Sequence, residues 1–242
     1  MIPRVGDVLR VSCPSSATQV ASVSAFDVSV RSPWWRVDPD VDWIRWNGDI
    51  AIARDPASWD WQRGLLRTDP PAYDLQSGDH CTVGIPEVVV HVIDVEVFDP
   101  PRKTGWLPRP FADVVVLRYG ESVDPRIENQ GTSIDLDDAM PTELKLLFRP
   151  YAFLEVGDDL ASSDGRAWRF DGAWEWLAYD GSGVEAPSWP LTLISRRGEA
   201  SPLDAVAIRQ ATVEGSHLDE IERWREHSGA DISPGRRAAR AR

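Results

Sequence analysis

Four side chains that could transfer a proton lie in one β-rich stretch of the sequence: His80, His91, Asp94 and Glu96. Imidazole and carboxylate groups are the usual general acids and bases of enzymes, so a barrel with this set at its mouth could catalyse proton transfer. Because side chains alternate between the two faces of a strand, we expect His91 to share the core face with Ile93, and the two carboxylates to face water. Two interpretations stay open: His91 is a hydrogen-bonded core residue, or it belongs to an acid–base site.

The residues that precede His91 are similar to part of a known metal-binding motif. Gly78-Asp79, Ile85-Pro86 and His91 resemble the second half-motif of cupins, in which a Gly-Asp turn leads into Ile-Pro and a His follows the Pro by five residues. The resemblance covers only residues 78–91 and implies a β-barrel. The upstream His-x-His and Glu of the cupin ligand set do not occur in this sequence, and one His cannot hold a divalent ion alone. We therefore predict neither a metal nor another cofactor.

Two acidic clusters could bind a divalent cation weakly or could be solvated turns. They are Asp38, Asp40 and Asp42, and Asp135, Asp137 and Asp138. The first begins like an EF-hand loop, but Trp43 stands where the sharp turn of that loop requires Gly. The spacing of both clusters favours solvated turns.

A tryptophan-rich hairpin pattern gives the candidate binding surface. In residues 168–176 an Asp-Gly dipeptide lies between apolar residues, which favours a two-residue type I′ turn. That turn would place Arg169 opposite Trp174. Arg169, Trp174 and Trp176 would then share one face and could stack on a flat or apolar partner. The alternative is that another segment covers this face and makes it core.

Charge and composition narrow the class of partner. The 242 residues carry 26 Lys or Arg against 39 Asp or Glu, a net charge of −13, and include 12 Trp. A negative field disfavours nucleic acid and anionic membranes and favours a protein partner, including a basic one. The chain begins without a secretory leader pattern, and no apolar run reaches the ~20 residues of a membrane helix, so we expect a cytoplasmic protein.

These features predict an intracellular, acidic, Trp-rich protein that binds another protein, as adaptors or immunity-type inhibitors of basic toxins do. The alternative is a β-barrel that binds a small molecule, or an enzyme with an acid–base site around His91. The sequence contains no Gly-x-Ser-x-Gly elbow, phosphate-binding loop or dinucleotide fingerprint. Whether the chain is an enzyme, and its oligomeric state, are left open.

The order of elements predicts a mainly antiparallel β-fold, a barrel or sandwich built from hairpins, with one or two C-terminal α-helices. A first hairpin is expected at 44–52 around an Asn-Gly dipeptide, and the run 81–98 should pair with 114–117. We expect one β-domain over 1–197, or two small barrels divided near 121–138. A helical segment over 198–230, starting at Ser201-Pro202 and again at Ser216, precedes a disordered basic tail over 231–242.

Overall fold

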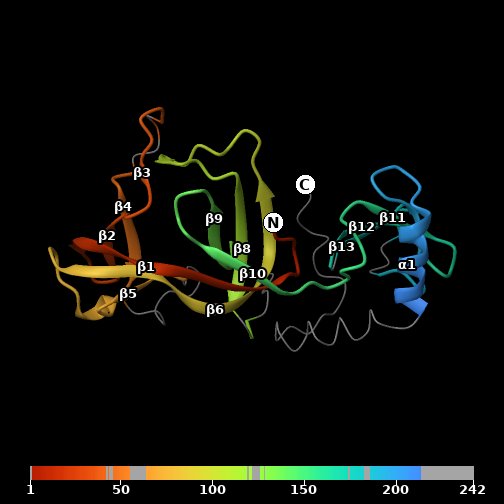
Figure 1. Ribbon diagram of the computed structural model, residues 1–242, viewed down its shortest axis with the longest axis horizontal. Helices are drawn as coiled ribbons and strands as arrows, with labels where there is room; N and C mark the ends of the chain where they lie inside the picture. The colour runs from red at the N-terminus through yellow and green to blue at the C-terminus, as the bar shows by residue number, and fades with distance from the viewer. Residues whose placement is uncertain are drawn as a thin grey trace.

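The computed structural model describes residues 2–41, 43, 46–54, 64–118, 120–121, 126–127, 129–173, 175–182 and 186–213. These residues form mainly antiparallel β-structure, with a curled half-barrel and one C-terminal helix, as the sequence predicts. Figure 1 shows a large sheet of long strands at one end of the molecule and a small sheet with the helix at the other.

Two long strands, β1 (Val8–Val23) and β6 (His80–Val97), pair antiparallel and organise the large sheet. The other strands of this sheet are β2 (Asp27–Arg31), β4 (Asp49–Ala53), β5 (Arg67–Asp69), β8 (Ala112–Arg118), β9 (Thr132–Leu136) and β10 (Glu143–Phe148). Their order is β4-β2-β1-β6-β8-β9, while β10 also pairs with β1 and β5 pairs with β6. A short 3-10 helix, η1 (Ala72–Asp74), follows β5.

The valine-rich part of β6 pairs with β8, which confirms the predicted pairing of 81–98 with 114–117. Val92 lies opposite Val116 and Val95 opposite Val114, and these side chains pack into one core cluster. β-branched side chains suit a pleated, buried surface of this kind. The half-barrel therefore encloses an apolar interior.

The hairpin predicted at 44–52 lies only partly within the described residues, and its second strand, β4, has a partner that we did not predict. Strand β4 pairs with β2, with Val28 opposite Ile52 and Val30 opposite Ile50. Val28, Val30 and Ile52 are buried together in a second core cluster, and this burial outweighs the local turn preference of Asn-Gly. Residues 44 and 45, the first strand of the prediction, lie outside the described residues. The segment between β2 and β4 carries β3 (Arg36–Val37), which pairs with β7 (Trp106–Leu107).

The small sheet contains β11 (Asp158–Ala161), β12 (Ala167–Gly172), β13 (Glu175–Ala178) and β14 (Thr192–Ser195), in the order β13-β12-β11-β14. The chain passes from the large sheet to the small one between Phe148 and Asp158. The division into domains, including the one near 121–138, stays a prediction.

Helix α1 (Pro202–Val213) begins at the predicted Ser201-Pro202 and packs on the small sheet through Ile208, which is 1% exposed. The hydroxyl of Ser201 donates to the carboxylate of Asp204, and the Ser201 carbonyl accepts the first helical hydrogen bond, from Ala205. The predicted second helix and the basic tail over 231–242 lie outside the described residues.

One tight turn precedes a strand at three places, residues 4–7, 76–79 and 155–158, which we call the Gly-Asp turns. The third residue of each is a Gly with φ of 91° or 92°, a conformation that L side chains rarely adopt. The Asp at the fourth position accepts a hydrogen bond from the backbone N–H of the first residue, at 3.0, 2.8 and 2.9 Å. The Asp side chain thus closes its own turn.

The three turns differ in what else binds the Asp. Asp7 and Asp158 are fully buried, whereas Asp79 is exposed. Arg149 donates to both carboxylate oxygens of Asp7 at 2.7 and 2.6 Å, and Arg196 to both of Asp158 at 2.9 and 2.8 Å. Asp79 has no ion pair within the described part of the chain.

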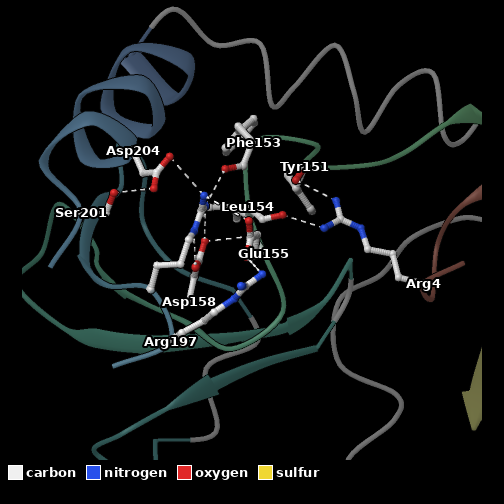
Figure 2. A network of polar contacts seen from close by, with 10 residues as sticks. Arg4, Tyr151, Phe153, Leu154, Glu155, Asp158, Arg197, Ser201 and Asp204 are labelled. Carbon is white, nitrogen blue, oxygen red and sulfur yellow. Dashed lines mark hydrogen bonds and ion pairs between the residues drawn. The ribbon is translucent and has the colours of Figure 1, made fainter. Parts of the chain in front are cut away.

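The N-terminal segment also binds the loop that leads into the small sheet. Arg4 Nη1 donates to the carbonyl of Leu154 at 2.6 Å, and its Nη2 donates to the carbonyls of Pro150 and Tyr151, both at 3.0 Å. Figure 2 shows the Arg4 side chain reaching this loop. Three carbonyls on one guanidinium fix the loop against the first residues of the chain.

Candidate functional site

The predicted acid–base residues are not brought together. His80 is exposed at the start of β6, whereas His91 is 1% exposed eleven residues further along the same strand. Asp94 and Glu96 face water, as predicted. No hydrogen bond or ion pair joins His91 to either carboxylate among the described residues.

Burial lowers the pKa of His91 to about 4, so the imidazole is neutral near pH 7. An irregularity in β6 between Val92 and Asp94 also changes the predicted faces, because Asp94 pairs with Val115 and therefore lies on the same face as His91. The strict alternation that we assumed is wrong at this point. His91 behaves as a core residue, and whether the set has a role in catalysis stays a prediction.

The register of the second hairpin differs from the predicted one. Phe170 lies opposite Trp176 and Arg169 opposite Leu177, and the turn falls beyond the Asp-Gly dipeptide because β12 continues to Gly172. Trp176 therefore shares a face with Phe170 and not with Arg169, and the predicted separation of the side chains into two faces is wrong.

The aromatic cluster of the small sheet explains this register. The rings of Phe170 and Trp176 are 4.9 Å apart, and both contact Tyr151, while Trp189 stacks on Tyr151 at 5.8 Å. Burial of these rings outweighs the preference of Asp-Gly for a two-residue turn. Arg169 is exposed and donates two hydrogen bonds to Asp171. Trp174 lies outside the described residues, so partner binding by this set stays a prediction.

An open groove lies on the half-barrel. Its volume is about 1150 Å³, and it is lined by residues from two segments, 33–40 and 100–109. These segments are joined where β3 pairs with β7, with Arg36 opposite Leu107. We call it the tryptophan groove, because Trp34 and Trp35 line it.

Hydrogen bonds hold both groove indoles by their edges. Trp35 Nε1 donates to the carboxylate of Asp137 at 2.6 Å, and Trp34 Nε1 donates to the hydroxyl of Ser16 at 3.2 Å. The Ser32 hydroxyl oxygen accepts from the backbone N–H groups of both Trp34 and Trp35. The indoles are partly exposed and rigidly placed, as recognition of a partner requires.

A series of aromatic ring contacts connects the groove indoles to two further tryptophans. Trp34 contacts Trp35 with ring centroids 5.9 Å apart, Trp35 contacts Trp106 at 6.0 Å, and Trp106 contacts Trp46 at 5.7 Å. Pro33 and Pro101 are exposed parts of the lining and add rigid apolar walls. The groove is therefore an aromatic and proline surface on a fixed base.

The charge of the groove is opposite to that of the whole chain. Its lining carries four cationic side chains, Arg36, Arg102, Lys103 and Arg109, and one carboxylate, Asp40. Arg36 and Lys103 are exposed and have no ion pair among the described residues. In a chain with a net charge of −13, this is a local basic surface.

Two carboxylates of the first acidic cluster, Asp38 and Asp40, hold the Arg109 side chain in place. Its Nε donates to Asp38 at 2.8 Å, and its Nη2 lies 3.4 Å from Asp40. Asp38 is 2% exposed, and its hydrogen bond from Arg109 lowers the pKa of the carboxyl below its usual range. Asp38 is therefore the counter-ion of Arg109. Asp42 lies outside the described residues.

No three His, Cys, Asp or Glu side chains within the described ranges are arranged to hold a metal ion. In the second acidic cluster, burial and the nearby Asp113 and Asp137 raise the pKa of Asp135 to about 6. Near pH 5 the carboxyl of Asp135 is therefore mostly protonated.

Sequence reasoning missed the groove because its lining comes from segments about 70 residues apart, joined only by the two-residue pairing of β3 and β7. Two local signals mark it in retrospect. Pro33-Trp34-Trp35-Arg36 places two indoles beside a cation, and Pro100-Pro101-Arg102-Lys103 contains one of the two lysines of the chain.

Comparison with known proteins identifies no relative. No protein-family model matches the chain, and no curated protein or solved structure is significantly similar to it. Among the described residues no helix is both long and apolar enough to cross a membrane.

Proposed function

We propose that the chain is a binding protein and that the tryptophan groove is where it engages another protein. The observation that carries this proposal is the open, rigid groove that combines indoles, prolines and cationic side chains. Trp and Arg are enriched among the residues that dominate protein–protein binding, because each offers a large contact area together with polar groups. The predicted adaptor or immunity-type role is the biological setting that we propose for this activity.

The shape of the groove favours a protein over a small molecule. Small-molecule pockets enclose most of their ligand and have volumes of roughly 300–1,000 Å³. The groove is open, with a volume of about 1150 Å³, and suits a segment that passes along it. The burial of His91 gives no support to an acid–base site at a barrel mouth.

Capture of partners from a lysate of the source cells tests the proposal. Immobilised wild-type protein is compared with Trp35→Ala and with Pro101→Glu, which places a carboxylate on the exposed groove wall. Both variants should retain at least tenfold less of the captured protein, which is quantified by mass spectrometry. If Trp35→Ala destabilises the fold, Pro101→Glu still tests the groove, because Pro101 is exposed.

Phe26→Ala is the matched control, because Phe26 is an aromatic residue that is 69% exposed in the turn between β1 and β2, away from the groove lining. It should capture the same protein as the wild type. Normal capture by folded Trp35→Ala and Pro101→Glu, as judged by circular dichroism, would show that the groove is not the binding surface.

A further inference from the structure

We infer that the segment bound in the tryptophan groove is extended, rich in proline and acidic. This inference rests on the proposed function and names the chemistry of the partner. Its basis is that Arg36, Arg102 and Lys103 lie around a surface made of indole and proline rings.

The charges of the lining select an acidic partner. Asp38 and Asp40 already bind Arg109, so that cation is matched within the protein. Arg36 and Lys103 make no ion pair among the described residues, and Arg102 lies over the Phe98 ring at 5.3 Å. Asp38 and Asp135 act on Lys103 and Arg102 only at longer range, without a direct ion pair. Three cations are left for an incoming segment, and carboxylates are the groups that bind them most strongly in proteins.

The apolar part of the lining selects an extended, proline-containing backbone. Open grooves lined by aromatic rings bind polyproline II segments, since such segments are already extended and lose little entropy on binding. The polyproline II helix has three residues per turn, so an acidic residue at every third position forms a single row along one edge. In this arrangement the prolines face the indoles and the acidic edge faces the cations.

Nucleic acid is the other polyanion that could meet these cations, with bases stacked on the indoles. The rest of the chain argues against it, because the groove supplies only three cations without an ion pair among the described residues, while the protein as a whole carries −13. A phosphate at every nucleotide would extend into that negative field, whereas a short acidic segment need not.

Synthetic peptides test the inference directly. The probe is a fluorescein-labelled peptide of four Glu-Pro-Pro repeats, and its Kd for the full chain is measured by fluorescence anisotropy. Peptides of four Gln-Pro-Pro and four Lys-Pro-Pro repeats are the matched probes. We expect the Gln peptide to bind at least tenfold more weakly than the Glu peptide, and the Lys peptide not to bind measurably.

Two double variants assign the effect to the groove. Arg36→Ala with Lys103→Ala should weaken binding of the Glu peptide at least tenfold. Lys145→Ala with Arg197→Ala removes the same two charges from exposed positions outside the groove lining and should change the Kd less than twofold. Equal weakening by both pairs would mean a general charge effect and would overturn the inference.

The outcomes separate the inference from the proposed function. Equal affinity for the Glu and Gln peptides would overturn the acidic partner but would leave a groove that binds proline-rich segments. Tighter binding of a twelve-nucleotide oligo(dT) than of the Glu peptide would overturn it in favour of nucleic acid. If no peptide binds while Trp35→Ala and Pro101→Glu still lose the captured protein, the inference fails and the proposed function stands.

Discussion

The half-barrel and the small sheet begin with the same turn, and each completes it with an arginine from a distant part of the chain. Asp7, just before β1, is bound by Arg149, and Asp158, the first residue of β11, is bound by Arg196. The Gly-Asp turn before β6 has the same backbone and its own Asp79, but no arginine of the described segments pairs with that carboxylate. Local sequence therefore builds the turn, and a partner far away in the sequence decides whether its carboxylate is buried.

The two sheets differ more in their buried titratable groups. The half-barrel contains His91 and Asp135, whose pKa values are moved by burial. In the small sheet the buried carboxylate of Asp158 is matched by Arg196, which also lies 3.3 Å from Asp204 in α1. A change of pH should therefore affect the half-barrel more than the small sheet.

Removing one charge of a buried pair should have the largest effect. Asp158→Asn and Asp7→Asn leave a guanidinium without its carboxylate, so each should lower the free energy of unfolding by about 3–5 kcal/mol. Urea denaturation at pH 7 measures this change. Asp79→Asn, in the exposed turn, should cost only about 0.5–1 kcal/mol. If Asp79→Asn lowers the free energy of unfolding as much as the other two substitutions, the distinction between buried and exposed Gly-Asp turns is wrong.

Acid should destabilise the half-barrel through His91. The unfolded imidazole binds a proton below pH 6.5, while the folded one stays neutral to about pH 4, so stability is lost as the pH falls between these values. The full shift corresponds to about 3 kcal/mol. The difference in unfolding free energy between the wild type and His91→Leu, measured from pH 7 to pH 4, should show this slope, because the subtraction removes the opposite contribution of Asp135. As the pH is lowered, the amide protection factors should decrease in β6 before they decrease in β12. The opposite order would contradict the assignment.

Asp135 should contribute an effect of similar size and opposite sign. Because its folded pKa is raised to about 6, the folded state holds a proton that the unfolded state releases above about pH 4. Stability from this group is present at low pH and is lost as the pH rises through 6. Asp135→Asn should therefore raise the free energy of unfolding by about 3 kcal/mol at pH 7.5. At pH 4 the variant should match the wild type, and a gain there of the same size would point to a cause other than ionisation.

Glycine substitutions should affect the two regions equally. Gly78 and Gly157 have a φ of 91°, and a Cβ at either position would meet nothing within 4 Å. Gly78→Ala and Gly157→Ala should each cost about 1 kcal/mol, because only backbone strain opposes them. Thermal unfolding of both variants checks this. A clear difference between them would show that the surroundings, and not the turn itself, set the cost.

Sequence reasoning succeeded where a signal is local and agrees with burial. Ser201-Pro202 marks the start of α1, and the valine runs identify the pairing of β6 with β8. It failed where a local turn preference competes with packing, as at Asp171-Gly172, where the contact of Phe170 with Trp176 sets the register.

Single side-chain contacts between distant segments could not be predicted. Nothing near Asp7 in the sequence indicates Arg149, and nothing near Trp35 indicates Lys103. The groove exists because loops far apart in the chain meet at a pairing of only two residues per strand. The net charge also does not predict the charge of a local surface, since a chain with a net charge of −13 has a basic groove.

The pairing of Asp7 with Arg149 has a consequence for biosynthesis. The two residues are separated by 142 positions, so the ribosome makes the carboxylate long before its guanidinium. At 5–20 residues per second, roughly 7–30 s pass between them. During that interval Arg4 also lacks the carbonyls of Pro150 and Tyr151, so the earliest residues of the nascent chain reach their final contacts only late in translation.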